Sequence, residues 1–216
     1  MANLTADRKS ERKQGIIFEL PTAATARIYS GSLVSVDASG YLVPSSDSST
    51  ESFLGISRKE SDNSAGSNGD ILSEGYLTGI FQMNASSVTQ VDVLSEAYIV
   101  DDNTVGLGIV AQPTNVTGVA LERTPLSVGG TKSLAYTNAT TLLSWGGGTG
   151  IDVSAGGTFA LTATDGSTLI ATVTAGSLPV SDQSDNIQLR NQKAGRIVEA
   201  VSATSVFIDI STAARS

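Results

Sequence analysis

The sequence predicts an all-β protein with a small β-barrel or β-tulip-like core domain, an extended N-terminal arm and an inserted β-sandwich-like domain. Short apolar runs are separated by Gly, Pro, Asp, Asn and Ser at the spacing of antiparallel strands. Helical periodicity is almost absent. Only 5% of the 216 residues are aromatic, so we expect a core of many small and β-branched side chains.

The expected strands of the first half follow one another closely. They cover residues 16–20, 27–29, 33–36, 41–43, 53–56, 71–77, 79–83 and 97–100. Turns are expected in the polar segments 60–70 and 101–103. One short helical turn is expected at residues 89–96, because Thr89 can cap it and Asp92 stands three residues later, where a capping box places its acid.

A change in composition marks an inserted domain at residues 109–186. This segment contains one Lys and one Arg among many Gly, Thr and Ser, and the strand-like alternation continues through it. It is long enough to form a small sandwich of its own. We therefore divide the chain into an arm at 1–14, a core domain at 15–108 that is completed by 187–216, and the inserted domain between the two core segments.

The core domain is expected to close with a hairpin of residues 195–201 and 205–210. Side chains alternate between the two faces of a strand. The pattern places Val206, Ile208 and Ile210 on one face. Phe207 and Asp209 fall on the other face.

The N-terminal arm holds four of the thirteen cations of a chain whose net charge is −8. A charged segment with one large apolar residue after the initial Met cannot bury itself, so we expect it to order against a partner. Asp7 and Glu11 among the cations favour pairing with a protein over phosphate binding. The candidate contact residues of the arm are Asn3, Leu4, Thr5, Arg8, Lys9, Arg12 and Lys13.

The amino-acid composition limits the kinds of catalysis and binding that the chain can perform. The chain contains neither Cys nor His, which excludes thiolate nucleophiles, imidazole acid–base catalysis and ordinary zinc sites. We expect no enzyme and no cofactor. The negative charge disfavours nucleic acid and anionic membranes, and no apolar run is long enough to span a bilayer. A hydrolase that uses scattered carboxylates is kept as a rival.

The acidic loops leave an alternative open. Carboxylate and amide oxygens suit a hard cation such as calcium, but no window has the ligand spacing of a known metal loop. The other interpretation is that these side chains hydrogen-bond the backbone of their own turns. The residues concerned are Asp62, Asn63, Asp70, Asp101 and Asp102.

Trp145 is the single tryptophan and precedes the glycine-rich run 146–150. The first interpretation is that its ring anchors the core of the inserted domain. The alternative is a surface contact at a loop tip, where an aromatic ring can stack on a sugar. That alternative corresponds to a surface adhesin or a carbohydrate-binding module that acts on a host-surface glycan.

Short segments in a fixed order carry a family resemblance. They are the leader MANLTADR with the basic stretch after it, and residues 27–34, 53–56, 62–66, 97–105 and 206–210. In this order the chain resembles a family of tailed-phage capsid decoration proteins, also called head-stabilising or cement proteins. The resemblance covers about residues 1–108 and 187–210. The inserted segment departs from it, because shorter relatives lack that segment.

The resemblance implies a structural virion protein. Such a protein is made in the host cytoplasm and sits on the outer surface of the capsid as an oligomer, expected to be a homotrimer. There it binds the phage major capsid protein and stabilises contacts between capsid subunits. On this expectation the arm contacts the capsid and the inserted domain projects outward. The resemblance implies no role for the inserted domain itself.

Overall fold

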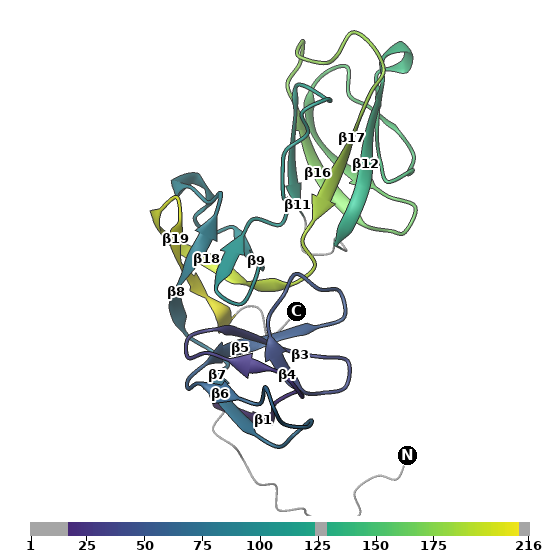
Figure 1. Ribbon diagram of the computed structural model, residues 1–216. Coiled ribbons are helices and arrows are strands. Elements are labelled where there is room, and N and C mark those ends of the chain that lie inside the picture. The colour runs from purple at the N-terminus through teal and green to yellow at the C-terminus, as the bar shows by residue number, and fades with distance from the viewer. Residues whose placement is uncertain (1–16, 124–128, 212–216) are drawn as a thin grey trace, which may run out of the picture.

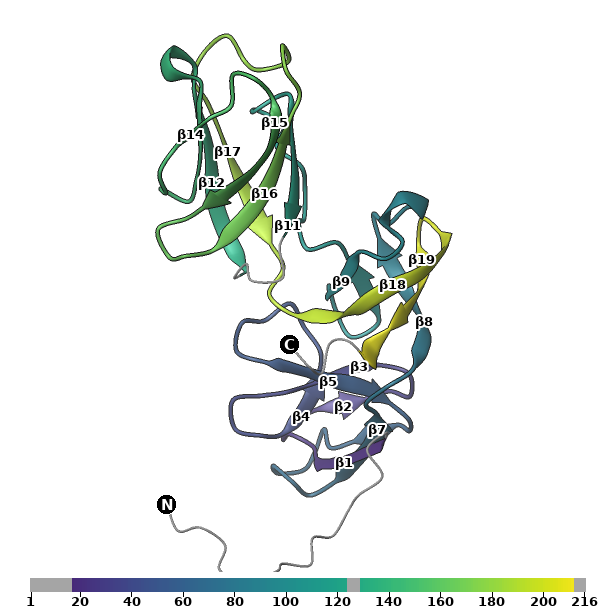
Figure 2. The ribbon, with the colours of Figure 1, turned by 180° about the vertical axis from the view of Figure 1, so that it is seen from behind.

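The computed structural model describes residues 17–123 and 129–211, which form nineteen strands and two short 3-10 helices. The fold is all-β, as the sequence predicts. Three β units are arranged one after another in space: an N-terminal sheet, a closed barrel and a sandwich (Figure 1). The first strand and the sandwich lie at opposite ends of an elongated molecule, as the view from behind also shows (Figure 2).

The N-terminal sheet is antiparallel, with the strand order β1-β7-β5-β3-β4. Its strands are β1 (Ile17–Pro21), β3 (Leu33–Val36), β4 (Leu42–Pro44), β5 (Ser52–Ser57) and β7 (Leu72–Tyr76). A parallel bridge between Thr22 and Leu42 joins its two edges. A small two-stranded sheet of β2 (Arg27–Ile28) and β6 (Ser61–Asp62) accompanies it.

A compact apolar cluster fills the N-terminal sheet. Phe18, Ile28, Val34 and Leu42 are buried together in it. The ring of Phe18 lies directly over Gly75, where an added Cβ would come within 2.2 Å of the ring. Glycine at this position therefore permits strand β7 to pass beneath the ring.

Five strands close into a barrel in the order β10-β8-β19-β18-β9. They are β8 (Ile80–Ser86), β9 (Glu96–Ile99), β10 (Thr104–Gly106), β18 (Lys193–Ser202) and β19 (Ser205–Asp209). Strands β8 and β10 pair in parallel and the other neighbours pair antiparallel. Leu33 and Ile56 from the N-terminal sheet pack into the barrel core, so the two units share apolar contacts.

The closing hairpin of the barrel is the one expected from the sequence. Val206, Ile208 and Ile210 are fully buried, whereas Phe207 and Asp209 are only partly covered. Strands β18 and β19 pair through the hairpin with two register shifts. The period-two pattern predicted this division into two faces, and the structure shows that the face with Val206, Ile208 and Ile210 enters the core.

The expected helical turn is a single turn of 3-10 helix, η1 (Gln90–Asp92). The carboxylate of Asp92 accepts hydrogen bonds from the backbone N–H of Thr89 at 2.7 Å and from its hydroxyl at 2.8 Å. The acid at the third position thus caps the turn as predicted. The chain rejoins the barrel where the N–H of Leu94 donates to the carbonyl of Ile197.

The sandwich packs a four-stranded sheet, β14-β13-β12-β17, against a three-stranded sheet, β11-β16-β15. Its elements are β11 (Val119–Arg123), β12 (Gly130–Thr137), η2 (Asn138–Thr140), β13 (Leu142–Trp145), β14 (Ile151–Asp152), β15 (Gly157–Thr162), β16 (Thr168–Val173) and β17 (Gln183–Leu189). The expected end of the inserted domain at residue 186 falls inside β17. Ile187 and Leu189 are buried in the sandwich core, so the sandwich extends to Leu189.

Candidate interaction surface

The arm residues selected from the sequence lie outside the described part of the chain. They are Asn3, Leu4, Thr5, Arg8, Lys9, Arg12 and Lys13. Strand β1 begins at Ile17. The surface around β1 is therefore the described surface that is nearest to the arm along the chain.

Charged side chains of both signs gather on this N-terminal unit. We call this group the mixed-charge surface. It consists of Arg27, Arg58, Lys59, Glu60, Asp62 and Glu74. Strands β2, β6 and β7 and the segment between β5 and β6 contribute these residues.

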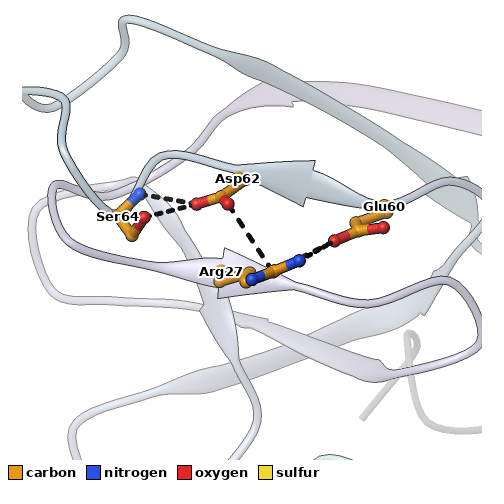
Figure 3. A network of polar contacts seen from close by, with 4 residues as sticks. All are labelled: Arg27, Glu60, Asp62 and Ser64. Carbon is orange, nitrogen blue, oxygen red and sulfur yellow. Dashed lines mark hydrogen bonds and ion pairs between the residues drawn. The ribbon is translucent and has the colours of Figure 1, made fainter.

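One half of the mixed-charge surface is centred on Arg27 (Figure 3). Its Nη2 lies 2.6 Å from Oε1 of Glu60, and its Nε lies 3.6 Å from Oδ2 of Asp62. Asp62 in turn accepts hydrogen bonds from the N–H and the hydroxyl of Ser64. The hydrogen bond with Glu60 is the main cause that raises the pKa of Arg27, and the bonds from Ser64 lower the pKa of Asp62.

An exposed aromatic ring adjoins this half. The Arg27 guanidinium carbon lies 4.9 Å from the centre of the Tyr29 ring, which is 52% exposed. The geometry is that of a cation–π contact. Arg27 therefore lies between a carboxylate pair and an aromatic ring on a surface that is open to a partner.

The other half is centred on Glu74 in β7. Lys59 Nζ lies 2.7 Å from one carboxylate oxygen, and Arg58 Nη1 lies 3.3 Å from the other. The hydrogen bond from Lys59 is the main cause that lowers the pKa of Glu74. Glu19 lies directly opposite Glu74 in the register of β1 and β7. The charged surface thus reaches the strand that follows the arm.

These ion pairs contribute little to folding because they are exposed to solvent. The Arg27, Glu60, Asp62, Arg58 and Lys59 side chains are between 44% and 62% exposed. Exposed pairs typically contribute from zero to about 1 kcal/mol of stability. Such an arrangement is better suited to recognition, since complementary charges set the orientation and the rate of docking.

The loop residues considered as cation ligands are engaged in hydrogen bonds, some within their own turns and some with distant segments. Asn63 is 1% exposed and its amide nitrogen donates to the carbonyls of Thr22, Ala23 and Ser67. Three aspartates accept hydrogen bonds from backbone N–H groups two or three residues away: Asp62 from Ser64, Asp70 from Ser67, and Asp101 from Asn103. Asp102 accepts a hydrogen bond from the hydroxyl of Ser32. Across residues 17–123 and 129–211, no three acidic side chains form a group that could hold a metal ion.

Trp145 is a core residue. It lies in β13 with 1% of its surface exposed and packs with Leu134, Leu143 and Leu161 in the sandwich core. The alternative of a surface contact through Trp145 is therefore corrected, because a ring that is almost completely buried offers no platform for a sugar. The first interpretation from the sequence, a core anchor, agrees with this position.

A polar joint between the units has no signal in the sequence. Asp47, from the loop between β4 and β5, accepts hydrogen bonds from the backbone N–H of Asn191 at 2.6 Å and from its side-chain amide at 3.1 Å. Its other oxygen lies 3.6 Å from Arg190 Nη1. Gln192 donates to the carbonyl of Ser46 at 2.8 Å. The segment that connects the sandwich to the barrel is thus bound to the N-terminal unit.

The joint continues between the sandwich and the barrel. Arg123, at the end of β11, lies over the Tyr98 ring at 4.4 Å and donates to the carbonyl of Gly108. The Tyr98 hydroxyl donates to Glu96, which also pairs with Lys193. Burial is the main cause that raises the pKa of Tyr98 and lowers the pKa of Arg123. Both connections between sandwich and barrel therefore pass through this set of contacts.

No protein-family model, curated protein or solved structure matches the chain. Within the described residues, no helix has the length and apolar character needed to span a membrane. Function is therefore inferred from the residues of the chain itself.

Proposed function

We propose that the chain is a structural virion protein that binds the outside of a phage capsid and stabilises contacts between subunits of the phage major capsid protein. It acts as a homotrimer on the outer surface of the virion after synthesis in the host cytoplasm. The arm and the mixed-charge surface contact the capsid, and the sandwich projects outward.

The placement of β1 relative to the sandwich is the observation that best supports the proposal. Strand β1, which follows the arm, and the sandwich lie at opposite ends of the molecule (Figures 1 and 2). A protein that docks through the arm and the adjoining N-terminal unit would hold the sandwich away from the shell. The mixed-charge surface lies on the same unit as β1, so it can extend the contact that the arm begins.

The physical demands of capsid stabilisation fit the composition. A stabilising protein needs many modest contacts that are repeated around a lattice, and linked contacts multiply weak affinities through effective concentration. Exposed, preordered ion pairs provide specific contacts of this modest strength. The carbohydrate-binding alternative is not carried further, because its proposed aromatic contact, Trp145, is buried.

Co-sedimentation with expanded phage heads that lack decoration tests the proposal. The full chain is expected to sediment with such heads, and native mass spectrometry is expected to find three copies in the free oligomer. Deletion of residues 2–14 should weaken binding about tenfold or more, which corresponds to about 1.4 kcal/mol. Absence of the full chain from the sedimented heads would overturn the proposal.

A pair of arginine substitutions tests whether head binding depends on the mixed-charge surface or only on the overall charge of the protein. Arg27→Glu reverses one charge in the mixed-charge surface, and Arg196→Glu reverses an exposed arginine on the barrel strand β18. We expect Arg27→Glu to weaken head binding and Arg196→Glu to leave it unchanged. Equal effects of the two variants would remove the mixed-charge surface from the proposal, while the arm would still be tested by its deletion.

A further inference from the structure

Most strand edges in the described part of the chain are closed or covered. The barrel is closed, and the bridge from Thr22 to Leu42 joins the two edges of the N-terminal sheet. An uncovered edge presents unpaired N–H and C=O groups that attract another strand, so proteins commonly protect their edges. The two sheets of the sandwich are open, so their edge strands need another form of protection.

Two edges of the sandwich are covered by its own chain. The Gln112 side-chain amide binds the edge of β11 like a short strand: its nitrogen donates to the carbonyl of Leu121 at 2.9 Å, and its oxygen accepts from the N–H of Leu121 at 2.8 Å. On the other sheet, the N–H of Val110 donates to the carbonyl of Gln188 in β17. Both edges are thus occupied by the segment that leads into the sandwich.

The outer edge of β15 differs. The N–H of Ala163 donates to the carbonyl of Ser167, on the side of β16. Backbone N–H and C=O groups point to alternate sides along a strand, so those of Thr158 and Ala160 point away from β16. Among the strands at residues 17–123 and 129–211, β15 pairs only with β16. Across the residues that the structure describes, no backbone hydrogen bond reaches Thr158 or Ala160 from another segment. Their N–H and C=O groups face outward, whereas the carbonyl of Thr162 at the end of the strand lies against Gly148.

The sequence of β15 carries none of the usual protection against strand pairing. It reads GTFALT, without a charge or a proline, and its register with β16 runs through six residue pairs without a bulge. Thr158, Ala160 and Thr162 have exposed and small side chains. A regular, uncharged edge of this kind favours the addition of another strand.

A groove of about 430 Å³ adjoins this edge. It is lined by Gly147, Gly148, Thr149, Ile151, Ala160, Thr162, Ala163 and Thr164. None of the lining side chains is charged, and Gly147 is exposed without a side chain to cover its backbone. The groove therefore offers backbone, hydroxyl and small apolar contacts beside the unpaired groups of β15.

We propose that the outer edge of β15 and this groove bind an extended, uncharged segment of a partner protein by strand addition. The outward N–H and C=O groups of Thr158 and Ala160 can pair with the backbone of an added strand. The uncharged lining selects a segment without charges, and the small side chains at alternate positions of β15 select small or β-branched residues in the bound strand. This site belongs to the sandwich and acts independently of capsid binding by the N-terminal unit.

A substitution that removes one outward N–H tests the site directly. Ala160→Pro removes the N–H that faces away from β16, which a proline on an edge strand tolerates. Ala160→Lys places a charge at the same position. Ala120→Lys is the matched control, because Ala120 is also an exposed alanine, on β11, the opposite edge strand of the same sheet.

The probe is a displayed library of random peptides of about ten residues, long enough for one strand, selected on the full chain. We expect enriched peptides to be uncharged, with small or β-branched residues at alternating positions. Their affinity should fall about tenfold or more with Ala160→Pro and Ala160→Lys, and should be unchanged with Ala120→Lys. Binding should also slow hydrogen exchange of the Ala160 amide in the unaltered protein.

Three results would overturn the proposal. One is the absence of any enriched peptide, and another is equal binding of the enriched peptides to the Ala160→Pro variant that retains the native fold by NMR. The third is self-association of the full chain that Ala160→Lys abolishes, which would identify a second copy as the occupant. Head binding by the Ala160 variants should be unchanged, so failure of this site and failure of the capsid proposal are distinguishable.

Discussion

Replacement of Asp47 by asparagine tests whether the polar joint fixes the connection between the units. The substitution keeps the size of the side chain and removes its charge. Asp47 accepts two hydrogen bonds from Asn191 and pairs with Arg190, and the Asp47 and Arg190 side chains are only 17% and 12% exposed. In Asp47→Asn, an amide N–H₂ group replaces one of the two carboxylate oxygens. This group, which cannot accept a hydrogen bond, then faces either Arg190 or Asn191.

The expected cost follows from these contacts. A hydrogen bond to a charged group contributes about 1 kcal/mol more than one between neutral groups. Two such bonds to Asn191 therefore lose about 2 kcal/mol in total. The weakened pair with a largely buried Arg190 adds to this loss, because that cation loses its partner. We expect the joint to open about 2.5 kcal/mol more easily, which corresponds to about sixtyfold.

Native-state hydrogen exchange is the suitable assay, because a protein with several units does not unfold in a single two-state step. The protection of the Asn191 amide should fall about sixtyfold in Asp47→Asn. Glu199→Gln, which neutralises an exposed acid on β18, is the control and should leave that protection unchanged. Unaltered protection in Asp47→Asn would refute the reasoning that the joint depends on this carboxylate.

Two further predictions concern the sandwich. The hydrogen bond from Lys132 is the main cause that lowers the pKa of Asp165, and the hydrogen bonds from Ser167 lower it further. The stabilisation that results is fully present above the ordinary Asp pKa of about 4. It is lost as the pH falls through the lowered pKa. NMR titration should show the Asp165 midpoint rising toward the ordinary value in Lys132→Ala, and an unmoved midpoint would contradict the assignment. Trp145→Ala should destabilise the sandwich by about 3–5 kcal/mol, measured by urea unfolding with circular dichroism; a cost near zero would show that the ring is not a core anchor.

Local patterns predicted much of the fold. Alternation in residues 206–210 predicted which side chains share a face, and Thr89 with Asp92 predicted the capped turn, because each signal depends on neighbours in the sequence. Barrel closure was harder to predict in detail. The parallel pairing of β10 with β8, and the entry of Leu33 and Ile56 into the barrel core, depend on contacts that no periodicity encodes.

The sites were less accessible to prediction than the fold. The polar joint links Asp47 to Asn191 across 144 residues, and polar residues in loops carry no pattern that announces a distant partner. The sequence also could not show that Gln112 covers one edge of the sandwich while Thr158 and Ala160 of β15 stay uncovered, since edge protection depends on strand order. The arm candidates, which were argued from charge, remain predictions because they lie outside the described residues.

The bridge between Ile109 and Leu189 brings the two ends of the sandwich segment side by side. Residues paired across antiparallel strands have Cα atoms about 5 Å apart, so a tight turn could span the gap between these two positions. Segments with adjacent ends can be gained, lost or exchanged without rethreading the surrounding chain. The position at residues 109 and 189 is therefore a natural grafting point, at which a different domain could be displayed on the same barrel.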